Sequence, residues 1–250
     1  MSENNEQKST PELSRRELLK MGTALSAGLL LPGLVSNPTK ASNSEKWWRE
    51  GTLKTRDFSA LETKPPQGMS SRQIKEHLGL YKKYVSSLNK VEEQEKASGI
   101  THDTLLNKGF AYGGTVLHEL YFANLSSSPK QLQGEGELIN ALERTYGAFE
   151  GFTNNFKTAG AAARGWVILG LNLTDGTLNI YGMDAHNEGS MLGFIWPVLV
   201  MDVYEHAYMI DHGTNKASYI DGFMNNIDWT VCEKRFGQGL GLITNSSLIV

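Results

Sequence analysis

The feature that most constrains this chain is an apolar run that ends in two polar side chains. Residues 196–201 read WPVLVM, and the segment DVYEHAY (202–208) follows with Asp202 and His206 four residues apart. A short, almost wholly apolar run is typical of a strand buried on both faces. Residues i and i+4 share a face in a helix and also in a strand, so the carboxylate and the imidazole can converge on one point. They are either two ligands of one metal ion or a buried, hydrogen-bonded Asp-His pair.

Two further histidines upstream favour the metal interpretation, because each lies on the apolar face of a predicted helix. The first helix is predicted from Ser70, where SSRQ has the spacing of a capping box, to about Lys96, and His77 lies on its apolar stripe. The second helix is predicted over 102–125 and carries His118 on its inward face. We expect the two helices to form an antiparallel hairpin.

The composition is that of a globular protein. Of the 250 residues, 20% are charged and 40% are hydrophobic, and the net charge of −3 gives no excess of positive charge for nucleic acid. The sequence contains no Gly-rich phosphate loop and no Ser-His-Asp motif. The single cysteine, Cys232, cannot form an internal disulfide, so stability must come from the core or from a bound metal ion.

Residues 1–41 are predicted to be an export signal and not part of the globule. Arg15 and Arg16 precede a small apolar run over 21–35, which is too short to span a bilayer as a stable helix. The pattern resembles a twin-arginine signal, with cleavage expected after Ala41; a chance Arg-Arg pair before an apolar anchor is the alternative. We expect a periplasmic or otherwise exported protein with no stable membrane span once the signal is removed.

The remaining segments predict an α+β fold, in which a helical hairpin (70–128) is followed by an α/β domain (129–237) with a three-stranded antiparallel sheet. Asp175-Gly176 between two apolar stretches is a strong signal for a β-hairpin. Residues 42–69 are interrupted by prolines and are expected to form an extended arm, and 238–250 a C-terminal tail. The elements expected in the second domain are helices over 135–146, 149–163, 218–225 and 229–236 and strands over 165–172, 177–183 and 196–201.

The segment DVYEHAY (202–208) resembles the signature of the iron/manganese superoxide dismutase family, in which a tryptophan normally stands at the position of Tyr204. The Asp-x-x-Glu-His-Ala-Tyr core is specific, and the flanking pieces occur in the family's order over roughly 70–236. Those pieces are Leu117-His118, Tyr146-Gly147, Phe152, Gly165-Trp166, Tyr219-Ile220, Phe223, Asn225 and Trp229.

The resemblance implies one metal ion per chain, Fe or Mn, held by one histidine from each hairpin helix and by the Asp and His of the signature. Those residues are His77, His118, Asp202 and His206, with solvent as a fifth ligand. Three imidazoles and one carboxylate without a thiolate suit iron or manganese in both the +2 and the +3 state. The implied reaction is the dismutation of superoxide to dioxygen and hydrogen peroxide, with two protons taken up.

The resemblance also implies a proton relay beside the metal. Tyr84 matches the family's gateway tyrosine, which hydrogen-bonds toward the solvent ligand. The family completes the relay with a glutamine, either one turn before the second histidine, where this chain has Gly114, or in the loop after the second strand. At the second place His186 is the candidate and Asn187 the alternative. Tyr84 and His186 are therefore the expected catalytic residues.

One position departs from the family's spacing. In most members the first ligand stands eight residues before the gateway tyrosine. Counting back from Tyr84 reaches Glu76, whereas His77 is seven residues away. His77 lies on the apolar stripe of the predicted helix, whereas Glu76 lies on the same face as Leu80 and Lys83. His77 is therefore the expected ligand. Glu76 as a carboxylate ligand is the alternative, and it would lower the redox potential.

The resemblance implies a homodimer formed through the Glu205/His206 region, where the family's glutamate bridges to the metal-bound histidine of the other subunit. Tyr81 replaces a family histidine, and Met209 replaces the tyrosine that this histidine meets across the interface. Lys216 stands where the family has an arginine that steers the anion, and it keeps the charge without the forked hydrogen bonding.

Two other functions remain open from the sequence. One is a catalytically inactive metal-binding or oligomeric envelope protein on the same scaffold, because the first-helix register is changed and the glutamine is missing. The other is a non-haem oxygenase, which would need two histidines and one carboxylate with open positions. A fourth ligand fills one of those positions here.

Overall fold

The computed structural model describes residues 49, 51–132, 134, 136–188 and 193–245. The predicted export signal (1–41) lies outside the described residues, as do the beginning of the predicted arm (42–48) and the end of the predicted tail (246–250). Throughout the described chain, no helix combines the length and the apolar character needed to cross a membrane.

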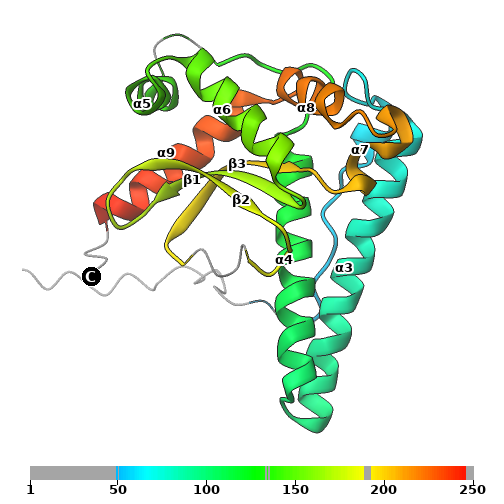
Figure 1. Ribbon diagram of the computed structural model, residues 1–250. Helices are drawn as coiled ribbons and strands as arrows, with labels where there is room; N and C mark the ends of the chain where they lie inside the picture. Colours follow the sequence, from blue (N-terminus) through cyan, green and yellow to red (C-terminus); the bar gives the residue numbers. More distant parts are fainter. Residues whose placement is uncertain (1–48, 50, 133, 135, 189–192, 246–250) are drawn as a thin grey trace, which may run out of the picture. The chain divides into compact units, whose positions relative to one another are not determined.

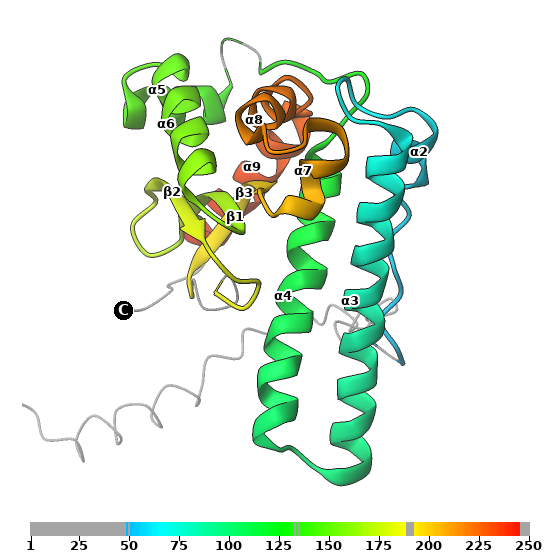
Figure 2. The same ribbon diagram turned by 45° about the vertical axis from the view of Figure 1, so that its right-hand side comes forward.

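Two long antiparallel helices form the first part of the fold. Helix α3 (Ser71–Ser98) and helix α4 (His102–Asn124) lie side by side (Figure 1, Figure 2). Helix α3 ends at Gly99, whose φ of 82° is readily adopted only by glycine. Helix α4 begins with a capping box between Thr101 and Thr104. The predicted helical hairpin is confirmed, with helix ends close to those expected.

The arm before the hairpin is partly helical, which corrects the prediction of an extended arm over 42–69. The short helix α2 (Ser59–Thr63) packs against α3 and buries Leu61. The prolines that indicate an extended chain come only after this turn, at 65–66. Further upstream, the backbone of Leu53 exchanges two hydrogen bonds with the side chain of Asn89, at 2.7 and 2.9 Å, which fixes the arm to α3.

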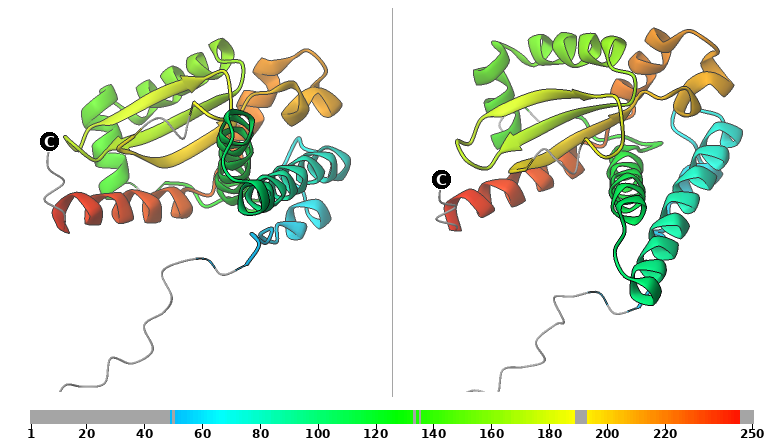
Figure 3. Two further views of the ribbon diagram at one scale, coloured as in Figure 1. Left: turned by 90° about the horizontal axis from the view of Figure 1, so that it is seen from below. Right: turned by 60° about the horizontal axis from the view of Figure 1, so that its bottom comes forward.

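The three predicted strands form one antiparallel sheet in the order β2-β1-β3. The strands are β1 (Trp166–Asn172), β2 (Leu178–Met183) and β3 (Ile195–Asp202). Helix α6 (Phe149–Ala162) packs on β1 and β2, and helix α9 (Trp229–Asn245) packs on β3, so that the sheet lies between helices (Figure 3). Helix α4 also contacts β3, which joins the hairpin to the sheet.

Helix α9 continues through most of segment 238–250, which the sequence predicts as a tail. Its glycines make this part a weak helix former by itself. A Cβ added at Gly239 would come within 2.8 Å of the side chains of Leu171 and Trp196, so the helix backbone lies close against the sheet. Packing that the local pattern does not reveal therefore extends the helix.

The signature segment is divided between two elements. Strand β3 ends at Asp202, and helix α7 (Glu205–His212) begins after the two-residue connection Val203-Tyr204. The sequence left open whether a helix or a strand holds both polar residues, and the structure uses the end of one and the start of the other. The remaining helices are α5 (Glu137–Tyr146) and α8 (Lys216–Asn225).

Candidate metal centre

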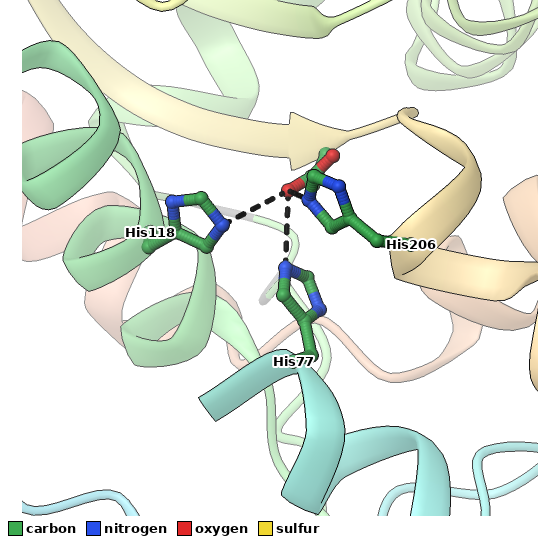
Figure 4. Close-up of side chains that lie close together, drawn as sticks. His77, His118 and His206 are labelled. Carbon is green, nitrogen blue, oxygen red and sulfur yellow. Dashed lines mark hydrogen bonds and ion pairs between the residues drawn. The ribbon is translucent and has the colours of Figure 1, made fainter. Parts of the chain in front are cut away.

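Four side chains from four different elements converge on one point. His77 comes from α3, His118 from α4, Asp202 from the end of β3 and His206 from the first turn of α7. Their ligand atoms all lie within 4.8 Å of one another. Figure 4 shows the three imidazole rings pointing toward a common centre from different sides. The four predicted ligands are thus brought together, three of them buried and His206 with its side chain 24% exposed.

The carboxylate of Asp202 lies between the three rings. Its Oδ2 is 3.1 Å from Nε2 of His77, 3.2 Å from Nε2 of His206 and 3.6 Å from Nε2 of His118. Each imidazole therefore presents the same nitrogen to the same oxygen. Such a set surrounds a position for a cation, provided that the nitrogens carry lone pairs and not protons.

The hydrogen bonds of His118 show that a cation fits. Its Nδ1 lies 2.5 Å from the carbonyl oxygen of Gly114, which can only accept, so Nδ1 carries a proton. Burial, together with the nearby His77, lowers the pKa of His118 to about 3, so the ring is neutral and Nε2 has a lone pair. Among the described residues this Nε2 has no hydrogen-bond partner. It faces a carboxylate oxygen, and a shared cation would turn two repelling atoms into two ligands.

The charges of the group also suit a cation. Burial alone raises the pKa of Asp202, but the charges and hydrogen bonds of His206 and His77 outweigh burial and hold this pKa well below its usual range. Burial lowers the pKa of His77. For His206, burial lowers the pKa and Asp202 raises it by more, so the net shift is upward. The group therefore offers one carboxylate anion and imidazoles of which only His206 favours a proton.

The donor set selects the kind of metal ion. Three imidazole nitrogens and one carboxylate oxygen, without a thiolate, suit iron or manganese. Cys232 is buried in α9 and is not part of the group. The part of the chain that the structure describes contains one group of this kind, which corresponds to one Fe or Mn ion per chain.

Tyr84, His186 and Trp166 form a chain of hydrogen bonds beside the metal ligands. The indole N–H of Trp166 donates to Nδ1 of His186 at 2.9 Å, and Nε2 of His186 lies 2.7 Å from the hydroxyl oxygen of Tyr84. Because an indole can only donate, Nδ1 of His186 has the lone pair and the neutral ring carries its proton on Nε2. Burial lowers the pKa of His186 to about 4, which keeps the ring neutral. His186 thus donates to Tyr84 and leaves the tyrosine proton for another acceptor.

Two consecutive glycines in α4 make room for this pair. A Cβ added at Gly114 would lie 2.6 Å from the ring of Tyr84, and one added at Gly113 would lie 2.0 Å from the carbonyl oxygen of His186. Neither glycine has space for a Cβ methyl group. The close approach of α4 to the His186 loop therefore depends on Gly113, and its close approach to Tyr84 of α3 depends on Gly114.

The structure separates each expected residue from its alternative. His77 is buried within the ligand group, whereas Glu76 is exposed on α3 and outside the group. His186 is buried and reaches Tyr84, whereas Asn187 is exposed. In both cases the buried residue of a neighbouring pair faces the metal ligands.

The resemblance places Tyr81 at the dimer interface and Lys216 at the substrate entrance. In the structure each of them forms hydrogen bonds within this chain. Tyr81 is fully buried; its hydroxyl donates to Glu119 and accepts the backbone N–H of Arg56, each at 2.8 Å. The ammonium group of Lys216 donates to the carbonyl oxygen of Ala163, and burial lowers its pKa. Both side chains therefore have structural partners of their own.

Sequence reasoning assigned no ligand-holding role to Gln73 or Tyr219, which hold the ligands in place. The side chain of Gln73 donates to the backbone oxygen of His206 at 2.6 Å and accepts a backbone N–H later in α7 at 3.2 Å. The hydroxyl of Tyr219 donates to the backbone oxygen of Asp202 at 2.6 Å. The local pattern indicates Gln73 only as a capping residue, and Ser70 does accept its backbone N–H at 3.0 Å. The long-range role of its side chain has no local signal.

The fold and the four ligands define a class of proteins, in which a helical hairpin and a small antiparallel sheet together hold one iron or manganese ion. Comparisons with known proteins agree with this class. Residues 134–235 match the model of the iron/manganese superoxide dismutases, C-terminal domain. The chain belongs to the iron/manganese superoxide dismutase family.

Relatives whose names give either metal are similar over most of the chain. Superoxide dismutase [Fe] of Aquifex aeolicus is 34% identical over 203 residues, which are 76% of this chain and 94% of that protein. Superoxide dismutase [Mn] 1 of Halobacterium salinarum is 30% identical over 190 residues, which are 73% of this chain and 92% of that protein. The names of these relatives thus include both metals.

Proposed function

We propose that this chain is a superoxide dismutase, which converts two superoxide ions and two protons into dioxygen and hydrogen peroxide. The observation that carries the proposal is the position of a tyrosine–histidine pair beside the four metal ligands, with 2.7 Å between Tyr84 and His186. The relatives named superoxide dismutase support it.

A bound iron or manganese ion supplies the one-electron steps in which one superoxide is oxidised and another is reduced. The chain's part is to hold its ligands in place before the ion binds. Gln73 ties the backbone of His206, and Tyr219 ties the backbone of Asp202. Fixed partners of this kind orient the ligand atoms and reduce the cost of arranging them on binding. A single carboxylate among three imidazoles leaves a loaded site attractive to an anion.

The proton for reduced superoxide comes, in this proposal, from the hydroxyl of Tyr84. Burial, with a smaller effect of Asp202, raises the pKa of Tyr84, so the hydroxyl keeps its proton at neutral pH. Its oxygen accepts from Nε2 of His186, and its own proton is free to be donated. After that donation, Nε2 of His186, which lies 2.7 Å from the hydroxyl oxygen, can supply a proton to Tyr84.

We propose further that the protein is exported and works as a homodimer. The twin-arginine pattern of Arg15 and Arg16 supports export to the periplasm or beyond. Glu205, Met209 and Ile210 are exposed on α7 beside His206, the last two at 43% and 42%. A carboxylate next to two apolar side chains, all close to a metal ligand, is a surface that a second subunit would cover.

The test of the proposed function combines metal analysis with an assay on the full chain. We expect Fe or Mn at about one ion per chain, as the single ligand group indicates, and rapid loss of superoxide at neutral pH. Tyr84→Phe keeps the ring and removes the donated proton, so we expect it to retain the metal and lose activity. Stoichiometric metal without superoxide loss in the unmodified protein would instead support the catalytically inactive metal-binding protein.

Export and assembly can be tested on the same gene. Replacement of Arg15 and Arg16 by lysine keeps the charge but removes the forked geometry of the guanidinium groups. We expect the doubly substituted precursor to remain in the cytoplasm. For the homodimer, Ile210→Glu is expected to shift the purified protein from dimer to monomer in light scattering. An unchanged distribution in either experiment would contradict the corresponding proposal.

A further inference from the structure

Tyr204 occupies the signature position at which the family normally has tryptophan. Its ring stacks on the metal ligand His206, with 5.2 Å between ring centroids and 16° between ring planes, and lies 5.0 Å from the ring of His186. Its backbone N–H donates to Oδ1 of Asp202 at 3.0 Å, which is the carboxylate oxygen that does not face the three imidazoles. Tyr204 therefore contacts two metal ligands and the histidine of the proposed relay.

The hydroxyl of Tyr204 reaches the loop that carries His186. It donates to the backbone carbonyl oxygen of Asp184 at 2.9 Å, directly after strand β2. The hydrogen bond joins the β3–α7 connection, which holds the metal ligands, to the loop that holds the relay histidine. A tryptophan has no hydroxyl to place at this carbonyl.

The other bonds at Asp184 lie on the exposed side of the loop. Its carboxylate accepts from the Nε and Nη2 of Arg164, at 3.0 Å for Nε, and from the backbone N–H of the same arginine at 3.2 Å. Its own backbone N–H donates to the carboxylate of Glu188 at 2.7 Å, also on the exposed side. The side chain of Arg164 is 80% exposed and that of Asp184 45%, so solvent and salt weaken this pair. The bond from Tyr204 instead comes from the direction of the metal ligands.

The position of His186 leaves little tolerance. Its ring must meet the indole N–H of Trp166 on one side and the hydroxyl of Tyr84 on the other, at 2.9 and 2.7 Å. Its backbone is pressed against α4 at Gly113. A change in the Asp184 peptide would move the ring relative to both partners at once.

We propose that the Tyr204 hydroxyl is a positioning group, which holds the Asp184 carbonyl so that His186 keeps its proton on Nε2 and donates it to Tyr84. The importance of this tether for catalysis rests on the proposed function. The tether itself can be observed without turnover.

The direct test is the nuclear magnetic resonance of the His186 ring nitrogens in the full chain. Gallium(III), a diamagnetic stand-in for iron(III), is the metal probe. In the unmodified protein we expect one tautomer, protonated on Nε2. In Tyr204→Phe, which keeps the ring over His206 and removes only the hydroxyl, we expect averaged shifts of two tautomers. Tyr204→Leu also lacks the hydroxyl and has no side-chain donor; it is expected to give the same averaging and provides a second variant should the first fail to fold.

Tyr181→Phe is the matched control, because it removes a tyrosine hydroxyl from strand β2 that has no hydrogen bond to the His186 loop among the described residues. We expect its His186 signals to be unchanged. When loaded with iron or manganese, Tyr204→Phe should keep its metal and lose activity by about 10-fold. Loss of a group that orients a residue of a metal site typically lowers activity by roughly 10–100-fold, and this expectation is the lower end of that range.

Two results would overturn the proposal. One is an unchanged His186 tautomer in Tyr204→Phe and Tyr204→Leu. The other is loss of metal from Tyr204→Phe, because the hydroxyl would then serve the ligands and not the relay. An unmodified protein that binds metal without activity would remove the proposed function, while the resonance comparison would still decide the tether.

Discussion

At the scale of single residues, the site depends on which nitrogen of each imidazole carries the proton. Nδ1 of His118 donates to the carbonyl of Gly114, whereas Nδ1 of His186 accepts from the indole of Trp166. The two rings are therefore opposite tautomers. The first presents a lone pair at Nε2 and suits a metal ligand; the second presents a proton at Nε2 and suits a donor. The residue type is the same, and the hydrogen-bond partner determines the role.

The ligand role of His118 leads to the first prediction. His118→Ala should lose its stoichiometric metal and its activity, with a loss of affinity above the roughly 10–100-fold that removal of a ligand's hydrogen-bond partner costs. Glu76→Ala is the matched control, because Glu76 is exposed on α3 outside the ligand group and should not affect metal content. Metal analysis of both purified variants checks this. Retained metal in His118→Ala, or lost metal in Glu76→Ala, would show that the ligands are wrongly assigned.

The protonation of His206 leads to a prediction on pH. In the metal-free protein, burial lowers the pKa of His206 and Asp202 raises it by more. The pKa of His206 in the folded protein therefore lies above its ordinary value of 6.5, and the ring binds a proton more readily than a free imidazole. A metal ion must displace the proton. The affinity for Mn²⁺ should therefore fall as pH decreases through the raised pKa, by about tenfold per pH unit below it. Equilibrium dialysis between about pH 8 and about pH 6 measures this, and a constant affinity over that range would contradict it.

At the scale of elements, the site is built where helix and strand ends meet. Helical periodicity in the sequence placed His77 on the buried face of α3 in preference to Glu76, and the structure agrees. The shared-face argument for Asp202 and His206 predicted their convergence but not its cause, since the strand ends at one and the helix begins just before the other. Periodicity identifies faces of regular elements, whereas the geometry of a connection depends on long-range contacts such as those of Gln73.

The glycines of α4 give a prediction at this scale. Gly113→Ala places a methyl group 2.0 Å from the carbonyl oxygen of His186, so helix and loop must separate. We expect a loss of stability of about 1–3 kcal/mol and lower activity. Gly109→Ala in the same helix would meet only Asn187, at 4.0 Å, and should stabilise the protein by about 0.5–1 kcal/mol. Chemical denaturation measures the stability of the two variants. Equal changes in stability would contradict the close approach of α4 to the His186 loop.

At the scale of the whole described chain, the order of helices and strands followed from sequence patterns, and the exceptions have a physical reason. The helix at 59–63 and the extension of α9 to 245 both depend on packing against distant elements. The hydroxyl bond from Tyr204 to Asp184 is another contact of this kind. Local patterns predict what a segment can form by itself and not which distant partner stabilises it.

The four ligands join α3, α4, β3 and α7, so metal binding should stabilise the entire fold. At a free metal concentration 1,000-fold above Kd the gain is about 4 kcal/mol, which corresponds to a Tm higher by roughly 10 °C for a chain of this size. Calorimetry of loaded and chelated protein measures the difference. His118→Ala should show no such dependence on metal. An unchanged Tm on metal removal would mean that the ion does not connect these elements.

The most direct measurement of the central claim is anomalous diffraction from crystals of the metal-loaded protein at the iron and manganese absorption edges. We predict one peak per chain, enclosed by Nε2 of the three histidines and Oδ2 of Asp202. A peak at any other set of side chains, or no peak between these four atoms in protein that contains stoichiometric metal, would contradict the account.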